Sequence, residues 1–501
     1  MSITSHLFLL VFLPVVCVTW RLANRHSSCA ARLCLLAAGI LFCGWSAPWS
    51  LLVLAGEGTA TYCLGRAISR PGSRKKPLLA TGVVLVVAVL FLFKYTGFFL
   101  APWTDGLPAW LAPLGLSFGS FQQLFYLRDC YHGEAGEVSP LDYACCLTLF
   151  ATATCGPITR VGELVPQLRR PEPFSWDGLA AGLYCFALGL FKKVLLAAIF
   201  TGGADYGFGL AGSLSPADSA VTILCYTLQI YFDFSGYCDM AWGMGRMMGL
   251  DLPVNFDSPY RAVSIQDFWG RWHITLSRFF RSCVYIPLGG NRRGMAVTCR
   301  NIMVIFLLSG LWHGAGWGFV IWGALHGVAM VVQRLWGKRK FLPRPLCWLL
   351  TFLFVNFAWV FFRAATLDQA LALLGDLAGS WAMPSAEMAA ALPPPPTREE
   401  IRGLKARAQA VLPGKVAYWS TRTGLVPTGV KITTARKRYG SCSGTNSLCF
   451  SCFLMNCPEE AVDLVVVHEL CHIREKNHGP GFYALLSQYL PDYRERKKLL
   501  Q

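Results

Sequence analysis

Apolar segments of about 20 residues recur between Ile3 and Phe362, and no other feature limits the possible folds of this chain so strongly. Of its 501 residues, 54% are hydrophobic and only 15% are charged, which excludes an ordinary soluble protein. Inside a bilayer every backbone polar group must be paired within the chain, so such segments fold as helices. The sequence therefore predicts an α-helical polytopic membrane protein with roughly nine to eleven spans.

Basic loops indicate how the first spans are oriented. No convincing cleavage site follows Ile3–Trp20, so we interpret it as a first helix and not as a signal peptide. Leu33–Gly65 divides at Trp45–Pro48 into two helices, which makes the basic loops on both sides cytoplasmic and puts the N-terminus outside. Later spans are expected at 78–100, 110–127, 141–158, 178–200, 219–237, 301–333 and 346–362. We expect a multi-pass protein of the inner (plasma) membrane.

The net charge of +17 bears on possible partners. A basic chain can bind nucleic acid, but here the Lys and Arg residues gather in short loops between apolar runs, where topology signals belong. We therefore expect membrane lipid, and no nucleic acid, as a partner. The 20 cysteines follow no regular spacing and many fall inside spans, so free core thiols are expected and not a disulfide framework.

Two histidines interrupt the stretch from Gln266 to Gly314, namely His273 and His313. An ionisable side chain at membrane depth is costly and usually faces a cavity or a pathway, so both are candidate site residues. The Pro/Gly-rich segment 286–294 lies between them, and irregular backbone survives at that depth only where it lines protein or water. We expect this stretch to lie at the interface or to dip in and out of the membrane.

Other charges also interrupt apolar runs. Lys94 in Phe-Lys-Tyr and Lys192 and Lys193 in Gly-Leu-Phe-Lys-Lys lie near span ends, where a lysine usually snorkels to the headgroups. Asp233 and Asp239 are six residues apart and point to different sides of one helix. We expect at least one of these aspartates to pair with an arginine.

A series of motifs occurs in order between residues 113 and 327: Pro-Leu-Gly-Leu-Ser-Phe, Cys-Gly-Pro-Ile-Thr-Arg, Gly-Leu-Phe-Lys-Lys, Tyr-Phe-Asp-Phe-Ser-Gly-Tyr-Cys-Asp, Phe-Trp-Gly-Arg-Trp-His-Ile-Thr-Leu-Ser, Ile-Pro-Leu-Gly-Gly-Asn, Leu-Trp-His-Gly-Ala and Trp-Gly-Ala-Leu-His-Gly. Over about residues 1–375 they resemble the membrane-bound O-acyltransferase family, in particular its alginate O-acetyltransferase branch. The resemblance implies a helix bundle with a central channel. It also implies transfer of an acyl group, acetyl by preference, from cytoplasmic acetyl-CoA or another acyl thioester to a hydroxyl of an exported polysaccharide, with a periplasmic acyl-transfer partner protein.

The resemblance also implies site residues. The essential histidine of the family falls on His313 and its second recurrent histidine on His273. An alcohol must lose a proton as it attacks a thioester, and an imidazole is the usual base, so His313 is the expected general base. His273 can orient the acceptor, relay the proton or brace the channel, and His326 is expected to be structural. Six arginines between residues 271 and 300 can attract an anionic donor, although topology alone also explains them.

A second kind of sequence follows residue 382. Residues 383–396 are rich in Ala and Pro and end in four prolines, which predicts a semi-rigid linker between a membrane domain, 1–382, and a soluble domain, 397–501. The soluble domain is expected to contain a helix at 398–411, strands at 430–435 and 447–452, and a helix from Pro458 through His472.

That last helix carries His468-Glu469-Leu-Cys-His472. Histidines at i and i+4 share one helix face and can ligate one Zn²⁺, while Glu469 between them can take a proton from an attacking water. His478 follows just beyond the helix, where the chain can turn back to supply a third ligand. Cys449 and Cys452 fall on opposite faces of a strand, which favours free thiols over a second zinc site.

The motifs Tyr-Gly-Ser-Cys-Ser, His-Glu-Leu-Cys-His, Asn-His-Gly-Pro and Leu-Pro-Asp-Tyr-Arg-Glu-Arg resemble the YgjP/SprT-like zinc metallopeptidases. This implies a small α+β zincin-like fold, a zinc-dependent hydrolase and a peptide or protein substrate. Two alternatives remain open: a transporter or channel with a histidine-lined pathway in place of the acyltransferase, and a non-catalytic zinc-binding module in place of the hydrolase.

The side of the membrane that the soluble domain faces is not fixed by these arguments. Counting spans after the basic loop at 334–344 leaves the domain outside, whereas its five cysteines suit a reducing cytosol. An additional half-span near 367–381, the absence of further membrane segments, or the joining of two reading frames would each explain the conflict. We expect a cytoplasmic domain.

Overall fold

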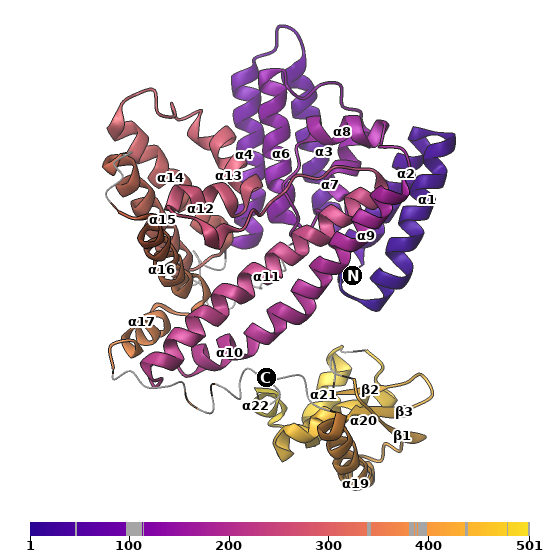
Figure 1. The fold of residues 1–501 in the computed structure, drawn as a ribbon. Helices are drawn as coiled ribbons and strands as arrows, with labels where there is room; N and C mark the ends of the chain where they lie inside the picture. The colour runs from indigo at the N-terminus through magenta and orange to yellow at the C-terminus, as the bar shows by residue number, and fades with distance from the viewer. Residues whose placement is uncertain are drawn as a thin grey trace. The chain divides into compact units, whose positions relative to one another are not determined.

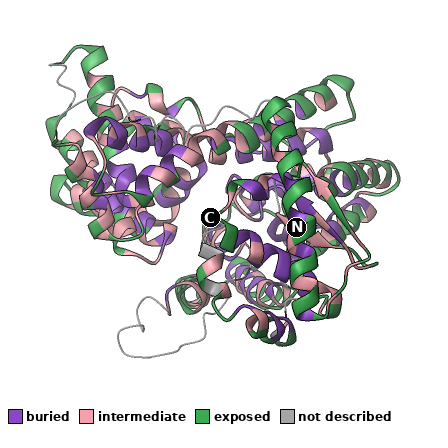
Figure 2. Cartoon of the chain, turned by 90° about the horizontal axis from the view of Figure 1, so that it is seen from below, coloured by how far each residue is buried: buried purple, intermediate pink, exposed green. Residues whose placement is uncertain are grey.

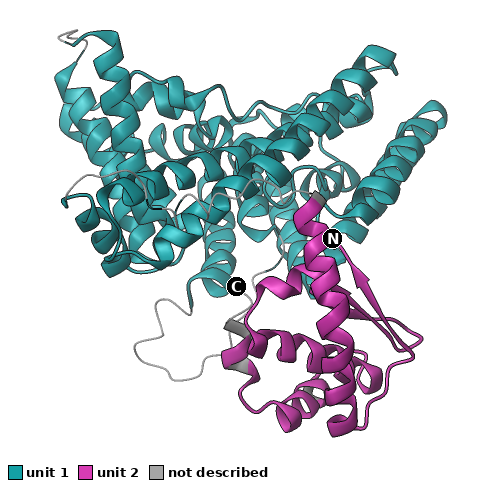
Figure 3. Ribbon diagram, turned by 60° about the horizontal axis from the view of Figure 1, so that its bottom comes forward, with its two compact units in different colours: residues 1–392 teal, residues 393–501 magenta. Residues whose placement is uncertain are grey.

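The computed structural model describes residues 1–45, 48–96, 113, 115–337, 342–379, 385, 388, 398–435, 439–477 and 479–498. The chain divides into two compact units, residues 1–392 and 393–501 (Figure 3). The first consists of helices and their connections, and the second combines helices with a three-stranded sheet. This confirms the predicted fold class of a helical membrane protein with a small α+β part. The expected linker at 383–396 lies outside the described residues, apart from Ser385 and Met388.

The described part of the first unit is built of helices (Figure 1). The N-terminal part contains the π-helical segment η1 (Phe8–Phe12), α1 (Leu13–His26), α2 (Ser28–Gly44), α3 (Trp49–Ser69), α4 (Lys75–Lys94), α6 (Leu116–His132), α7 (Pro140–Thr148) and α8 (Val161–Arg169). The remainder contains α9 (Trp176–Phe191), the π-helical η2 (Lys192–Leu196), α10 (Ala197–Gly209), α11 (Pro216–Met248), the 3₁₀ turn η3 (Pro259–Arg261), α12 (Ile265–Arg271), α13 (Ile274–Phe280), the π-helical η4 (Arg281–Tyr285), α14 (Met295–His313), α15 (Trp317–Trp336), α16 (Arg344–Arg363) and α17 (Leu367–Asp376).

Six helical stretches among the described residues are long and apolar enough to cross a membrane: Phe8–His26, Lys75–Lys94, Trp176–Gly209, Met295–His313, Trp317–Trp336 and Arg344–Arg363. Large apolar side chains on these stretches are exposed, among them Leu10, Val84 and Tyr184. Exposed positions recur along the helices in Figure 2. Extended apolar surface of this kind indicates contact with lipid. The chain is therefore a membrane protein.

The expected number of nine to eleven spans is not reached within the described residues, and one expected span is wrong. The apolar segment 141–158 forms only the nine-residue helix α7, followed by turns from Leu149. Its side chains are apolar because they fill the protein core, where Phe150 packs against Phe8 and Phe12. Hydropathy alone does not separate a buried loop from a span that faces lipid.

Glycines bring the continuous helix α9–η2–α10 close to α11 (Figure 1). A Cβ atom on Gly189 would lie 2.4 Å from the carbonyl oxygen of Gly236, and one on Gly243 would lie 2.6 Å from that of Gly182. Only glycine permits backbones to approach so closely, which is a common way to pack helices in membranes. The two long helices are therefore fixed in register.

This register corrects the expectation for the charged residues on these helices. Lys192 pairs with Asp239 at 2.6 Å, and Lys193 pairs with Asp233 at 2.5 Å. Both aspartates thus have a lysine as partner and not an arginine, and both lysines bind carboxylates instead of reaching for headgroups. A charge inside a membrane bundle is stabilised by such a partner.

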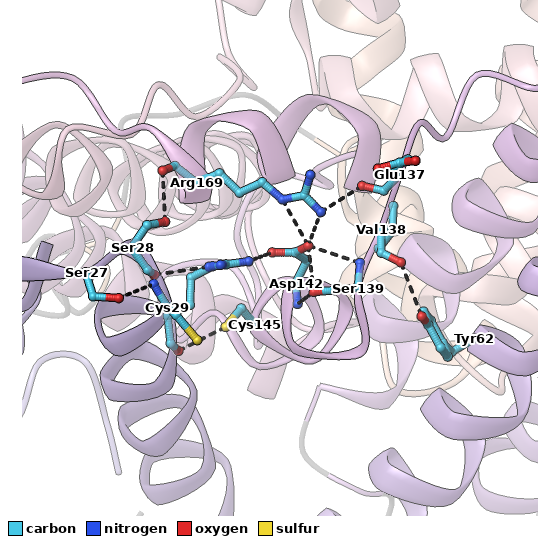
Figure 4. Close-up of polar contacts among 11 residues, drawn as sticks. Ser27, Ser28, Cys29, Tyr62, Glu137, Val138, Ser139, Asp142, Cys145 and Arg169 are labelled. Carbon is cyan, nitrogen blue, oxygen red and sulfur yellow. Dashed lines mark hydrogen bonds and ion pairs between the residues drawn. The ribbon is translucent and has the colours of Figure 1, made fainter.

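A buried carboxylate, Asp142 on α7, joins α2, α7 and α8 (Figure 4). It accepts hydrogen bonds from Arg32, from Arg169 at 2.6 Å and from the backbone N–H of Ser139 at 3.0 Å, while its side chain is 0% exposed. Burial alone would raise the pKa of Asp142, but the bonds from Arg169, Ser139 and Arg32 lower it to about 2. The carboxylate is therefore charged at neutral pH.

We expect Asp142→Asn to destabilise the first unit by about 3 kcal/mol, because it leaves two guanidiniums facing an uncharged group. The loss should appear as a lower unfolding temperature in detergent at pH 7. Below about pH 4 the difference from the wild type should shrink, since the lowered pKa gives stability that is lost as the pH falls towards 2. Asp177→Asn, at an exposed carboxylate, is the control. An equal shift in both variants would contradict this account.

The second unit packs helices around a small sheet (Figure 1). Its elements are α19 (Arg398–Thr423), β1 (Gly429–Thr433), β2 (Gly440–Cys442), β3 (Ser447–Ser451), the 3₁₀ turn η5 (Cys452–Asn456), α20 (Glu459–Arg474), α21 (Pro480–Tyr489) and α22 (Tyr493–Lys498). The strand order is β1-β3-β2, with β1 parallel and β2 antiparallel to β3. The predicted strands and the helix after Pro458 are confirmed. The first helix is longer than expected, because it continues through Pro413.

The core of the second unit lies between β3 and α20. Leu448 and Phe450 alternate with Cys449 along β3, and both are fully buried against α20. From α20, Val462 and Val466 belong to the same core. One face of α20 is therefore buried against β3. His468 and His472 are not part of this core.

Candidate functional site

A cavity of about 370 Å³ in the first unit is lined by both histidines that the sequence singles out. His313 is the last residue of α14, and His273 lies between α12 and α13. Other lining side chains are mostly aromatic and come from distant parts of the chain, among them Phe234, Trp272, Trp312, Trp359 and Phe362. The expected irregular backbone is also present, since turns occupy the segment between Ile286 and Arg293.

The orientation of His273 is fixed by Asn255. The Oδ1 atom of Asn255 accepts hydrogen bonds from the backbone N–H of Thr275 at 3.1 Å and lies 3.2 Å from Nδ1 of His273. Because Oδ1 only accepts, Nδ1 of His273 carries the proton and Nε2 has the free lone pair. Nε2 has no hydrogen-bond partner among the described residues, although His273 is only 1% exposed. His273 also adopts a left-handed backbone conformation, with φ of 45°, which costs energy for a non-glycine residue.

Aromatic rings surround His313. Its ring centroid lies 4.7 Å from that of Trp312 and 5.1 Å from those of Trp322 and Phe362. Rings at these distances restrict the imidazole, which is partly exposed at the wall of the cavity. His326 has a different environment: Trp269 Nε1 donates to its Nδ1 at 3.2 Å, and it is 0% exposed. Its position fits the expected structural role.

Lys94 is a cavity residue that the sequence interpretation missed. Its Nζ atom donates to the carbonyl oxygen of Trp312 and lies 3.5 Å from the hydroxyl of Ser117. The hydroxyl of the next residue, Tyr95, donates to the carbonyl of Leu311 at 2.6 Å. The last carbonyls of a helix need such donors, and a cation suits the negative end of the helix. The motif Phe-Lys-Tyr was a visible signal, but nothing near it in sequence points to α14.

Three of the six arginines in the 271–300 stretch have hydrogen-bond or ion-pair partners among the described residues. Arg271 pairs with Asp267 at 2.7 Å, and Arg278 pairs with Glu163. Arg300 donates to Asn301 at 2.9 Å. These contacts give Arg271, Arg278 and Arg300 a structural role. Arg281, from the same set, borders a separate cavity.

The second unit contains a candidate metal centre on α20. The ligand atoms of His468, Glu469 and His472 all lie within 4.8 Å of one another. The Nδ1 atom of His472 is 2.9 Å from the carbonyl oxygen of Glu475, which only accepts, so Nδ1 carries the proton and Nε2 is the nitrogen that can bind a metal. Two imidazoles are donors that Zn²⁺ prefers, and a carboxylate beside them can accept a proton from water, so the residues present fit zinc. His478 lies outside the described residues.

Glu469 is held between its own helix and strand β2. Its side chain is 7% exposed, and Oε1 lies 3.2 Å from Nδ1 of His468. A Cβ atom on Gly440 of β2 would lie 2.6 Å from Cγ of Glu469. A side chain at position 440 would therefore collide with Glu469. The glycine leaves room for the carboxylate beside the two histidines.

We expect Gly440→Ala to displace the Glu469 side chain without moving His468 or His472. Peptide hydrolysis should then fall at least about 10-fold while the bound zinc stays near the wild-type level, because only the proton acceptor has moved. Metal analysis and a peptide cleavage assay measure the two quantities. Gly444→Ala is the matched control, since a Cβ there meets nothing within 4 Å. Full hydrolysis by Gly440→Ala would contradict this role for Glu469.

All 20 cysteines are free thiols, as expected. In the second unit Cys452 is buried in the core, and Cys449 lies on the opposite face of β3 at intermediate exposure. The two side chains thus do not share a face. The described residues contain one group of histidine, cysteine and acidic side chains arranged for a metal, the one on α20.

Comparison with known proteins divides the chain into the same two kinds of sequence. Residues 68–367 match the model of the membrane-bound O-acyltransferase family. Residues 393–501 match the model of the YgjP-like metallopeptidase domain.

Several curated proteins are similar to the first unit. A peptidoglycan O-acetyltransferase from Helicobacter pylori is 39% identical over 74% of this chain and 79% of its own length. A probable alginate O-acetylase from Pseudomonas aeruginosa is 37% identical over 74% of this chain and 73% of its own length. A teichoic acid D-alanyltransferase from Bacillus subtilis is 27% identical over 63% of this chain and 82% of its own length.

Proposed function

Since the chain belongs to the membrane-bound O-acyltransferase family and is an acyltransferase, we propose that it moves an acetyl group from a thioester donor to a hydroxyl of a cell-surface polysaccharide. The observation that carries this proposal is the cavity lined by both His273 and His313. The named relatives acylate peptidoglycan, alginate or teichoic acid, so the shared acceptor class is a polymer outside the cytoplasm.

His313 acts as the general base in this proposal. The acceptor hydroxyl attacks the thioester carbonyl, the new ester C–O bond forms, the C–S bond breaks and the thiol leaves. An imidazole takes the hydroxyl proton during the attack, a step worth about 10²–10⁴ in rate. The aromatic rings around His313 support this role, because they hold the imidazole in place at the wall of the cavity.

His273 and Lys94 assist at the same cavity. His273 lines the cavity, and the free lone pair of its Nε2 can accept a hydrogen bond from the acceptor hydroxyl, while Asn255 fixes the proton on Nδ1. Lys94 brings a positive charge to the end of α14 next to His313. A cation at that place favours the negative oxygen that develops on the thioester carbonyl.

For the second unit we propose a zinc-dependent hydrolase that cleaves peptides. His468, His472 and the undescribed His478 would hold the ion, and zinc, when bound, supplies a Lewis acid that makes water nucleophilic at neutral pH. Glu469 takes the proton of the attacking water. The support is the clustering of these side chains on α20 together with the match to the YgjP-like metallopeptidase domain. The five cysteines of the second unit support a cytoplasmic position for it. For the first unit the proposed location is the plasma membrane.

The test uses the full-length protein in lipid vesicles with acetyl-labelled coenzyme A and a panel of three acceptors: peptidoglycan fragments, alginate and teichoic acid. A candidate periplasmic acyl-transfer protein is added in a second series, because the resemblance implies such a partner. Label should appear as alkali-labile ester on at least one polymer. Movement of a polymer or its precursor across the vesicle membrane in the absence of a thioester donor would support the alternative of a transporter and contradict the proposal.

A further inference from the structure

Another cavity, of about 370 Å³, lies where the last turns of α1 meet the connection between α8 and α9 and the end of α11. Its lining includes Val18, Arg21, Leu22 and Arg25 of α1. None of its lining residues belongs to the cavity of the two histidines. The acyl-transfer chemistry described above therefore leaves this cavity without a role.

Arg21 is held in a fixed position at the wall of this cavity. Its Nε atom donates to the carbonyl oxygen of Met247 at 3.2 Å, and Nη1 donates to that of Glu172 at 2.7 Å. A Cβ atom on Gly249 would lie 3.0 Å from Nη1, so the glycine leaves room for the guanidinium. Both acceptors are neutral carbonyls, and Arg21 forms no ion pair within the described chain. Its Nη2 atom remains for a ligand.

Arg25 lies one turn further along α1, where it is exposed. It also forms no ion pair with a described residue. The carboxylate in the lining belongs to Glu172, which pairs with Arg246 at 3.2 Å. The amide of Asn24 adds a donor to the same lining. Two guanidiniums one turn apart therefore present positive charge at this cavity, and phosphate oxygens match them well.

An apolar stripe along one face of the first helix leads to these arginines. It consists of Val11, Val15, Val18 and Leu22, and each of these side chains is about half exposed. Intervals of four, three and four residues place them on one helix face, and Arg25 continues the series three residues later. Phe8–His26 is one of the stretches able to cross a membrane. The stripe therefore faces lipid and ends at a cation.

Aromatic side chains beside the cavity indicate its depth in the membrane. Phe174 lines it, and the guanidinium of Arg21 lies 5.7 Å from the centroid of that ring. Trp176 packs edge-on against Phe174 and is 75% exposed. Exposed aromatic residues at the end of a span belong to the interface between membrane and water. The arginines are therefore expected at the level of the lipid headgroups.

We propose that this cavity binds an anionic phospholipid, with Arg21, Asn24 and Arg25 at its phosphate and an acyl chain along the apolar stripe. The stripe favours a lipid over free phosphate, which has no chain to cover it. The sequence predicts this basic loop on the cytoplasmic side, and anionic lipids give the cytoplasmic leaflet its negative surface potential. The inference concerns lipid binding and does not depend on the proposed function.

The test counts the lipids that the full-length protein retains. The protein is placed in nanodiscs with equal amounts of phosphatidylcholine and phosphatidylglycerol and then released into detergent, and the bound lipids are counted by mass spectrometry. We expect phosphatidylglycerol to be retained in preference to phosphatidylcholine. The preference should weaken in high salt, because ions screen charges at the membrane surface. Equal retention of the two lipids by the wild type would overturn the proposal.

The variants remove the charges of the cavity in steps. Arg25→Gln leaves the contacts of Arg21 intact and should lower the ratio of retained phosphatidylglycerol to phosphatidylcholine about 5-fold. Adding Arg21→Gln should remove most of the remaining preference, whereas Arg25→Lys alone should keep most of it because the charge stays.

The control is Arg70→Gln, at an exposed arginine that follows α3 and does not line this cavity. It should retain the two lipids in the wild-type ratio. The same ratio in Arg25→Gln and Arg70→Gln would overturn the proposal. Since acyl transfer is not measured, this failure is distinct from a failure of the proposed function.

Discussion

We expect His313→Ala to lower the rate of acyl transfer by about 10²–10⁴-fold while the protein remains folded. The variant removes the base that takes the acceptor proton, and the thioester carbonyl is then attacked by a neutral hydroxyl. The imidazole lies at the end of α14 among aromatic rings and makes no ion pair in the described chain, so its loss should disturb packing more weakly than chemistry. Steady-state transfer of labelled acetyl, with unfolding temperature measured in parallel, tests this.

The matched control is His132→Ala, at an exposed histidine that ends α6. It should transfer acetyl at the wild-type rate. His273→Ala should have an intermediate loss, because Nε2 of His273 positions the acceptor but does not remove its proton in our account. Unchanged transfer by a folded His313→Ala protein would contradict the role of His313 as base.

The second large effect is expected for Glu469→Gln. Glutamine keeps the shape of the side chain and cannot take a proton, so hydrolysis should fall by at least about 10²-fold. Zinc content should stay near the wild-type level, because His468 and His472 are unchanged. His472→Ala, in contrast, should lose the metal and the activity together. Metal analysis of the purified proteins and a peptide cleavage assay separate these outcomes.

Glu460→Gln is the control for this prediction, since Glu460 is an exposed carboxylate in the first turn of the same helix. It should retain both zinc and activity. If Glu469→Gln and the wild type both bind zinc and neither cleaves any peptide, the second unit is a metal-stabilised binding module, and the hydrolase proposal is wrong.

The cluster of His468, Glu469 and His472 in the candidate metal centre could be anticipated from the sequence, because its parts are local. His468, Glu469 and His472 lie within one helical turn, so helix geometry alone brings them together. What local spacing could not reveal is Gly440, whose lack of a side chain makes room for Glu469. That contact depends on how β2 packs against α20, which no spacing along the chain records.

The cavity lined by His273 and His313 could be anticipated only in part. The family resemblance pointed to His273 and His313, but not to the residues that orient them. Asn255 and Lys94 come from distant segments and act through contacts that arise only when the helices pack. A lysine near a span end usually snorkels to the headgroups, so Lys94 alone does not indicate a cavity residue, and nothing in the sequence near Asn255 points to His273.

Charge pairing showed the same limit. The motifs with Lys193 and Asp233 were both noticed, yet each was interpreted alone. Their pairing follows from the close approach of Gly189 and Gly236, which sets the register between the two long helices. The sequence of one helix shows which charged residues could form an ion pair. Which residue each one pairs with depends on how the two helices pack.

The most direct test of two catalytic centres in one chain is a crossed assay. Wild type, His313→Ala and Glu469→Gln are each measured for acetyl transfer and for peptide hydrolysis, in the same lipid preparation. Our account predicts that His313→Ala loses only acetyl transfer and that Glu469→Gln loses only hydrolysis. The account would be contradicted if either variant lost both activities, or if both variants kept both activities.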